Sequence, residues 1–334
     1  DTYFKKVDNL LFDRFLANTT GFNKLASNDL GIANYGTELM ISYKVINNKD
    51  FGLDFSVNGA INRDILLKLP AEYNGQYIRF DGSSYLQHNV FRVGRNTLSN
   101  YLRINQGVYQ TDADVPVDPV TGKRYQSNGV FFLGGDPIMK DVNGDYILDG
   151  RDYEVTGNSQ PLVTGGLSTN IRYKSWGLNI YATYTADRTI LNNALADRIA
   201  IMRNPYALSA VVPLNDLNIW TKPGDVAKYP YPYDYKRFDQ IQPLRADQTL
   251  WAESGSYLKI NNVTLSYMFP KKLIRKIGLN NLRIYASTDN LITFSPYSGP
   301  NPENVTALGR DISTGYPLPR TYNIGLNLEL ITGN

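Results

Sequence analysis

The feature that most restricts the fold of this chain is a strict alternation of apolar and polar side chains, repeated in segments of about ten residues. In residues 321–330 the apolar set is Tyr322, Ile324, Leu326, Leu328 and Leu330, and the polar set is Thr321, Asn323, Gly325, Asn327 and Glu329. Because successive side chains of a β-strand point to opposite faces, this segment predicts a strand with one apolar and one polar face. About ten residues is also the length of a tilted strand that crosses a bilayer.

The same two faces recur along the chain, and we count about eight spanning strands, the first at residues 3–15. In residues 257–269 the apolar positions change parity, which predicts one extra residue, a β-bulge, near Asn261 or Asn262. Further segments with this division of faces are 38–45, 50–57, 163–174, 178–185 and 282–289.

The predicted connections alternate between short and long. Short ones lie at 47–49, 174–176 and 270–280, and long ones rich in Gly, Pro, Asn and Asp lie at about 65–161, 188–255 and 293–319. Short turns at one rim and long loops at the other are typical of a transmembrane barrel with a periplasmic and an extracellular end. We therefore predict an all-β fold, part of a transmembrane antiparallel β-barrel with short periplasmic turns and long extracellular loops. The first long loop also predicts extra strands, near 76–80 and 89–93.

A soluble sandwich of two sheets shows the same two-residue period, with one face of each sheet packed and the other solvated. The loop lengths favour the barrel, because the turns of a sandwich are usually short at both ends. The chain has no apolar run near the roughly 20 residues of a membrane-spanning helix, so a membrane span would be built from strands.

The composition removes several classes of function. The net charge of +3 is small for 334 residues, and no basic stripe follows one face, so nucleic acid is not an expected partner. The chain has no cysteine and a single histidine, His88, and it contains neither a GxSxG nor an HExxH motif. The sequence therefore lacks the residues for a thiol nucleophile and the motifs for zinc hydrolysis or a Ser-His triad, and its spacing singles out no pair of carboxylates. We predict that the chain is not an enzyme.

The best local candidate for a ligand site is the acidic segment 141–152. Its oxygen-bearing residues are spaced like those of a calcium loop, and the candidate ligands are Asp141, Asn143, Asp145, the Ile147 carbonyl, Asp149 and Asp152. Against calcium, the sixth position of such a loop should be Gly but is Tyr146, and the twelfth is Asp instead of Glu. The competing interpretation is a solvated acidic turn. A bound Ca²⁺ would hold the loop in place and would not catalyse.

Aromatic residues crowd the second long loop between prolines. Those that could stack on sugar rings or contact a partner are Trp220, Tyr229, Tyr231, Tyr233 and Trp251. The alternative, which we favour, is loop packing and the interfacial aromatic girdle of a barrel. A separate basic turn, formed by Lys271, Lys272, Arg275 and Lys276, is most simply solvated in the periplasm near anionic headgroups, and no chemistry is assigned to it.

Three blocks of this sequence carry a resemblance to one family. The first comprises Tyr3–Leu11, Thr20–Phe22 and Asn34–Glu38. The second is the ordered series Gly135-Asp136-Pro137, Asp141-Val142-Asn143-Gly144-Asp145, Gly157-Asn158 and Thr164-Gly165-Gly166. The third comprises Ser256–Tyr267, Pro270–Lys272, Asn290–Phe294 and Gly315–Tyr322. In this order the blocks resemble SusC/RagA-type TonB-dependent outer-membrane transporters, from near residue 1 to near residue 330.

The resemblance implies the C-terminal portion of a larger barrel, of about 22 strands, in the outer membrane of a Gram-negative bacterium. It further implies import of oligosaccharides or peptides, a SusD-like surface lipoprotein as lid, and TonB acting through an N-terminal plug and TonB box that this sequence does not include. We therefore interpret the sequence as a fragment. It departs from the family at its end, where Leu330 is followed by Ile331-Thr332-Gly333-Asn334 instead of an aromatic terminus.

Two other functions remain open at this point. A complete small outer-membrane barrel would act as an adhesin or structural protein through its long loops. A soluble, calcium-bearing β-sandwich would bind carbohydrate. A barrel hydrolase is a weaker third alternative.

Overall fold

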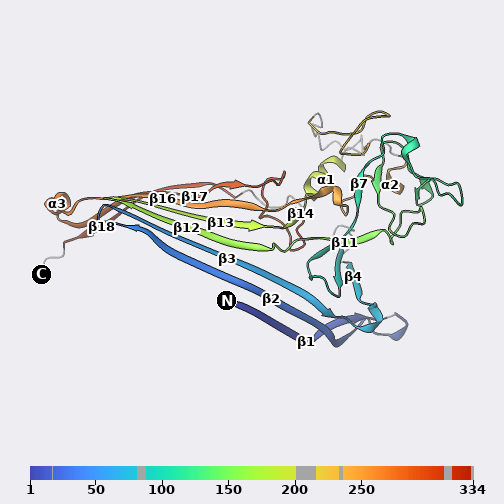
Figure 1. Ribbon diagram of the computed structural model, residues 1–334, viewed down its shortest axis with the longest axis horizontal. Helices are drawn as coiled ribbons and strands as arrows, with labels where there is room; N and C mark the ends of the chain where they lie inside the picture. The colour runs from blue at the N-terminus through green and yellow to red at the C-terminus, as the bar shows by residue number, and fades with distance from the viewer. Residues whose placement is uncertain (17, 81–87, 201–215, 233–235, 312–317, 332–334) are drawn as a thin grey trace.

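The computed structural model describes residues 1–16, 18–80, 88–200, 216–232, 236–311 and 318–331. Eight long strands form one sheet along the molecule. The long connections gather beyond one end of this sheet (Figure 1). These strands are β1 (Thr2–Phe15), β2 (Lys24–Asn47), β3 (Phe51–Lys68), β12 (Val163–Tyr173), β13 (Trp176–Ala186), β16 (Tyr257–Met268), β17 (Leu279–Phe294) and β18 (Thr321–Leu330).

All eight strands belong to one antiparallel sheet in the order β1-β2-β3-β12-β13-β16-β17-β18. Neighbours in the sheet are therefore also successive spanning strands of the chain. The expectation of about eight strands is confirmed, and the two-sheet sandwich is wrong. Among the described strands, β1 and β18 lie at opposite edges and do not pair with each other, as a closed eight-stranded barrel would require.

The register places like side chains side by side across the sheet. One cross-strand row is polar and consists of Asp54, Asn170, Asn179, Thr264, Ser287 and Asn323. The next row is apolar and consists of Leu53, Ile171, Leu178, Leu265, Ala286 and Ile324. Because adjacent residues of a strand point to opposite sides, the sheet has one polar and one apolar face.

The predicted bulge is confirmed at Asn261. Ile260 pairs with Ala182 and Asn262 pairs with Tyr181, so the residue between them has no partner on β13, and the same shift appears against β17. The extra residue lets the apolar side chains on both sides of the bulge stay on one face of the sheet.

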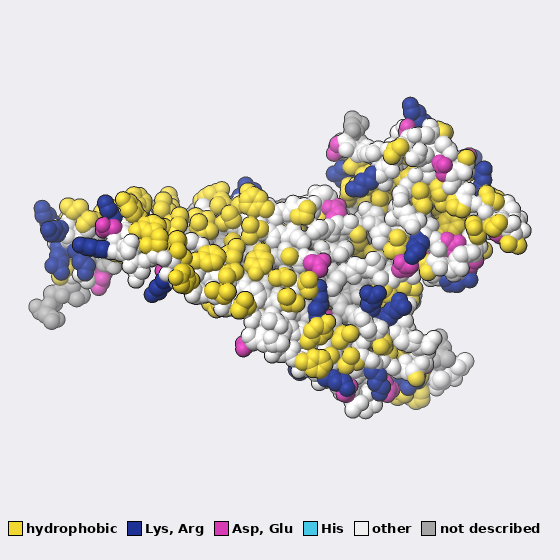
Figure 2. Space-filling view, viewed as in Figure 1, with side chains coloured by type: hydrophobic (Ala, Val, Ile, Leu, Met, Phe, Trp, Pro, Cys, Tyr) yellow, Lys and Arg dark blue, Asp and Glu magenta, His cyan; other side chains and the backbone are white. Residues whose placement is uncertain are grey.

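The apolar face is exposed over most of the strand length. Figure 2 shows the apolar side chains as a broad band along the strands, between a basic tip and the more polar loop end. In the last strand Ile324 is 87% exposed and Tyr322 69% exposed. A band of this extent is unfavourable in water, so this face is suited to lipid. Among the described residues, no helix has the length and apolar character needed to cross a membrane.

The long connections carry their own small elements. Strands β4 (Gln76–Phe80), β5 (His88–Arg92), β6 (Ser99–Arg103) and β11 (Tyr153–Asn158) form a four-stranded sheet, which confirms the extra strands predicted near 76–80 and 89–93. Two-stranded pairs are β7 (Asn105–Val108) with β10 (Pro137–Met139), β8 (Gln126–Ser127) with β9 (Val130–Phe131), and β14 (Thr189–Leu191) with β15 (Ala252–Ser254). Among the described residues the α-helices are α1 (Asn193–Ala200), α2 (Phe238–Ile241) and, in the short turn between β16 and β17, α3 (Lys271–Ile274).

The two clusters of buried apolar side chains lie in the loops and not in the sheet. One cluster consists of Tyr109, Val115, Tyr125, Phe132, Met139, Leu148 and Ile241. The other consists of Ala196, Ile199, Tyr229, Leu244, Ala246 and Trp251. The long loops are therefore packed bodies with their own cores, beyond the end of a sheet whose two faces remain open.

Candidate functional site: the polar face of the sheet

The polar face forms a hollow of about 800 Å³ near the loop end of the strands, which we call the loop-side hollow. Strands β2, β3, β12, β13 and β16 supply most of its lining, and Asp1 and Glu303 complete it. Its polar-face side chains include Glu38, Tyr181, Thr183, Tyr257 and Asn261. Hydroxyl, amide and aromatic groups together can hydrogen-bond a polar solute and stack on its flat surfaces.

The bulge aims an amide into this hollow. Asn261, the unpaired residue, accepts a hydrogen bond through Oδ1 from the Thr183 hydroxyl at 2.8 Å. Beside it the Lys259 ammonium donates to Glu303 at 2.6 Å, although Lys259 is only 6% exposed. Because a buried ammonium needs a partner, Glu303 of the third long loop ties that loop to the wall.

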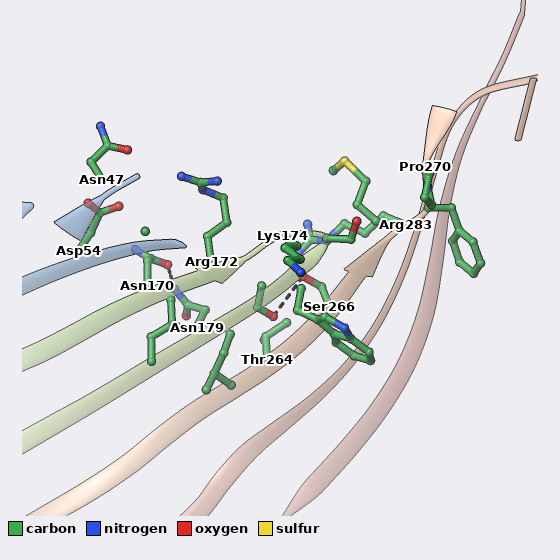
Figure 3. Close-up of a pocket in the computed structure, with 18 residues that line it drawn as sticks. Asn47, Asp54, Asn170, Arg172, Lys174, Asn179, Thr264, Ser266, Pro270 and Arg283 are labelled. Carbon is green, nitrogen blue, oxygen red and sulfur yellow. Dashed lines mark hydrogen bonds between the residues drawn. The ribbon is translucent and has the colours of Figure 1, made fainter. Parts of the chain in front are cut away.

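A second hollow of about 580 Å³, the turn-side hollow, lies on the same sheet near the short turns (Figure 3). Figure 3 shows Asn170 and Asn179 bonded to each other across β12 and β13, with Asp54 and Arg172 near them. The Arg172 guanidinium donates to the Asn48 and Lys49 carbonyls at 2.9 and 3.0 Å, which fixes the neighbouring turn.

The turn-side hollow carries an excess of positive charge. Its lining includes the cations Arg172, Lys174 and Arg283 and one carboxylate, Asp54. The loop-side hollow has the opposite balance, since Glu38 and Glu303 line it and the nearby Lys259 is paired with Glu303. The polar face therefore changes from acidic to basic along the strands, which gives it an electrostatic gradient for charged solutes.

The acidic segment 141–152 folds as a series of turns closed by its own side chains. Asp141 accepts from the backbone N–H groups of Gly144 and Tyr146 at 2.7 and 2.8 Å. Asn143 accepts from the Asp145 N–H at 3.1 Å, and Asp145 from the Ile147 N–H at 2.9 Å. Tyr146 adopts the positive φ (+61°) that a calcium loop requires at this position, despite the cost for a residue with a Cβ.

The remaining carboxylates of the segment either contact Arg151 or are buried. The Arg151 guanidinium contacts Asp145 at 2.5 Å and Asp149 at 2.7 Å, and its hydrogen bond holds the pKa of Asp149 below the usual range. Asp152 is buried and accepts from the Val142 and Asp149 N–H groups, and its burial raises its pKa. Within the part of the chain that the structure describes, no three His, Cys, Asp or Glu residues are grouped as metal ligands, and calcium in this loop stays a prediction.

The aromatic residues proposed for ligand contact mostly pack inside the loops. Trp251 is 1% exposed, stacks on Tyr229 at 5.9 Å and donates from Nε1 to the Arg245 carbonyl. Trp220 is also buried and meets Tyr231 edge to face at 5.7 Å. Of the five, Tyr231 is half-buried, and Tyr233 lies outside the described residues. The packing interpretation fits the three buried rings.

Sequence reasoning missed a buried charge cluster that joins the long loops. Asp247, fully buried, accepts from Arg245 and from the Tyr153 hydroxyl at 2.6 Å. Burial would raise the pKa of Asp247, but the hydrogen bonds and charge of Arg245 lower it overall. The guanidinium of Arg310 is also buried and makes no hydrogen bond to the described residues, and burial lowers its pKa to about 10. Polar residues far apart in the chain give no periodic signal that could have predicted this cluster.

Comparison with known proteins gives matches over nearly the whole chain. No family model matches it. The TonB-dependent receptor P3 of Formosa agariphila is 27% identical over 98% of this chain and 32% of that receptor. The TonB-dependent receptor SusC of Bacteroides thetaiotaomicron is 24% identical over 98% of this chain and 30% of that receptor. The chain spans about a third of the length of these relatives.

Solved structures show the same fold. A structure of the RagAB peptide transporter superimposes with a TM-score of 0.71 at 18% identity, covering 98% of this chain and 32% of that one. The RagAB peptide importer in the closed-closed state gives 0.66 at 20% identity, covering 98% and 33%. The open eight-stranded sheet thus corresponds to a section of an outer-membrane barrel wall. Over nearly its whole length the chain is therefore similar to SusC/RagA-type TonB-dependent receptors of the Gram-negative outer membrane, and it matches the C-terminal part of their β-barrel.

Proposed function

We propose that this chain forms part of the wall of an importer that carries oligosaccharides or peptides across the outer membrane in a TonB-dependent manner. The observation that carries the proposal is the polar face, where two hollows lined by hydroxyl, amide and charged groups follow one another along the strands. A wall of this kind lets a hydrated solute exchange its water for protein hydrogen bonds as it passes. The relatives that are named TonB-dependent receptors support the proposal that import depends on TonB.

The residues of the loop-side hollow suit both cargo classes, oligosaccharides and peptides. Tyr181 and Tyr257 offer flat apolar rings, and Thr183 and Asn261 offer hydrogen-bonding groups beside them. Sugar rings and peptide backbones both use such surfaces. The similar RagAB structures are named as a peptide transporter, which supports peptides as cargo, and oligosaccharides stay the alternative that the resemblance of the motifs implies.

The experiment measures cargo uptake by intact cells that differ only in whether they contain this protein. Cells with and without it receive labelled oligosaccharides and, separately, labelled peptides, with or without a protonophore that collapses the inner-membrane gradient. We expect one cargo class to enter only when both the protein and the gradient are present. Entry that ignores the protonophore would contradict TonB dependence, and no entry of either class would contradict import.

We also propose a SusD-like surface lipoprotein as the lid over the long loops. The loops present exposed side chains suited to a test, since Val120 is 89% exposed and Val226 is 76% exposed. A photo-crosslinking residue at either position should capture one lipoprotein in intact cells. The same probe at Tyr43, on the lipid-facing side of β2, should not capture it. Equal capture from Tyr43 would contradict a lid at the loop end.

A further inference from the structure

The short turn between β16 and β17 combines four cations with two exposed aliphatic side chains. Lys271, Lys272, Arg275 and Lys276 are all exposed, and none of them forms an ion pair with an acidic residue in the described parts of the chain. We call residues 271–277 the basic turn. Leu273 and Ile277 within it are 60% and 68% exposed.

The basic turn has a fixed shape and orientation. Ile274 is buried at 2% exposure, and Gly278 ends the turn with a positive φ of +78°. The Gly278 carbonyl accepts from the Ile331 N–H at 3.1 Å, so the end of the last strand is bonded to the end of the turn. The cations are therefore exposed on an ordered element of the fold.

Exposure separates the side chains of the basic turn into two groups. The turn consists of α3 followed by a 3-10 helix at Arg275–Ile277, and Leu273 and Ile277 both lie on its exposed surface. The four cations are exposed beside them in the same turn, and the buried Ile274 points to the protein. An element with an aliphatic side next to a basic side is typical of one that lies at a membrane surface.

An aromatic girdle marks the membrane boundary at this end of the sheet. Trp176 contacts Tyr267 at a ring separation of 4.8 Å, and Tyr267 contacts Phe269 at 5.1 Å. Trp176 and Tyr267 pair across the strands and continue the apolar rows of the lipid-facing side. Aromatic rings of this kind sit at headgroup level in membrane barrels. The basic turn begins two residues after Phe269, so it lies at the same level or just beyond it.

The surface view agrees with this placement. Figure 2 shows Lys and Arg side chains gathered at the end of the sheet where Figure 1 places α3, next to the apolar band. Short turns form the periplasmic rim of such barrels, so this end faces the phospholipid leaflet. Positive charge close to a membrane surface attracts anionic headgroups.

We propose that the basic turn is a binding site for anionic phospholipid headgroups of the periplasmic leaflet. Its cations contact the phosphates, and Leu273 and Ile277 enter the boundary with the acyl chains. The site is independent of cargo, because none of its residues belongs to the loop-side hollow.

The test uses the whole protein, purified from outer membranes and equilibrated with a phosphatidylcholine mixture that contains a minor share of phosphatidylglycerol. Native mass spectrometry then counts the retained molecules of each lipid. We expect the wild-type protein to retain phosphatidylglycerol selectively. The variant K271Q/K272Q/R275Q/K276Q should lose roughly tenfold of that selectivity, because each cation near the surface adds to the attraction.

Two control variants separate this site from general charge and from misfolding. K271R/K272R/K276R keeps the charge and should retain phosphatidylglycerol like the wild type. K123Q/K222Q removes two exposed cations from the extracellular loops and should also leave retention unchanged. Heat-modified gel mobility reports whether each barrel is folded.

Three results would overturn the proposal. The wild-type protein could retain both lipids equally, or the quadruple variant could fold and retain phosphatidylglycerol like the wild type. Full displacement of the lipid by millimolar-scale inorganic phosphate would show a site for free phosphate instead of a lipid headgroup.

Discussion

The ring of Tyr184 lies across Gly165, its paired residue on the neighbouring strand. A Cβ built at Gly165 would lie 2.5 Å from the Tyr184 hydroxyl oxygen, and that hydroxyl donates to the Asn58 carbonyl at 3.0 Å one strand further on. Tyr184 also covers Gly59 in the same way. An aromatic ring that covers strand glycines in this way replaces the contacts they lack and fixes the register of three strands.

The first prediction concerns this ring. Gly165→Ala should destabilise the sheet by about 1–3 kcal/mol, because the added methyl group collides with both the tyrosine ring and the Asn58 backbone. The measurement is the temperature at which the barrel loses its folded gel mobility. Gly150→Ala is the matched control, since a Cβ there meets nothing within 4 Å and the residue does not need a positive φ. An equal effect of both substitutions would contradict the role of Tyr184.

The second prediction separates the two faces of one strand. Tyr181 and Tyr184 lie three residues apart on β13 but on opposite faces of the sheet. If the loop-side hollow holds cargo, Tyr181→Ala combined with Thr183→Ala should lower uptake several-fold and leave barrel stability nearly unchanged. Tyr43→Ala on the lipid-facing side should not change uptake. Uptake by the Tyr181 and Thr183 variant at the wild-type rate would remove this hollow from the pathway.

The third prediction concerns the buried cluster of the loops. Asp247→Asn removes a carboxylate that contacts Arg245 inside the loops, and so weakens the charge pairing of a nearly buried guanidinium. The loss should be about 3–5 kcal/mol of local stability, since breaking a buried ion pair removes much of the compensation of the remaining charge. Limited proteolysis of the loops should speed up while the strands stay intact. Asp216→Asn, at an exposed loop position, serves as the control and should have no effect.

The fourth prediction is a pH dependence with a defined sign. The pKa of Asp247 is lower in the folded loops than the ordinary 3.8 of the side chain, so its stabilisation is complete above that value. It is lost only as the pH falls through the lower folded-state pKa. Protection of the loop amides against hydrogen exchange, corrected for the intrinsic exchange rate at each pH, should therefore stay constant until the pH drops below about 4 and then decrease. This transition should disappear in Asp247→Asn, and its persistence there would assign it to another group.

The fifth prediction tests calcium in the acidic segment. Arg151 contacts Asp145 and Asp149 and so competes with any cation for their oxygens. We expect Arg151→Gln to strengthen binding of Tb³⁺, a calcium substitute whose luminescence the Tyr146 ring can sensitise. Asp141→Asn combined with Arg151→Gln should abolish the gain. If Tb³⁺ luminescence is the same with and without Arg151, the segment is a solvated turn without a metal.

Much of the wall could be predicted from residue order. The two-residue period is a local property of the chain, so the alternation of Ile324 and Leu326 with Asn323 and Gly325 was enough to predict a strand with two unlike faces. The change of parity in residues 257–269 predicted the bulge for the same reason, and the pairing places it at Asn261. The resemblance of the motifs predicted the family, which the two-residue period alone could not do.

The sequence by itself determined the strands, their apolar and polar faces, and the division into short turns and long loops, because these depend on near neighbours in the chain. Only the tertiary structure decided what the loop residues do. It packed Trp251 and Tyr229 inside a loop core, brought Asp247 from one loop to Tyr153 of another, and placed Arg151 on the carboxylates of the acidic segment. Such contacts join positions far apart in the chain, and their energy comes from burial and charge pairing that exist only after the loops have folded together.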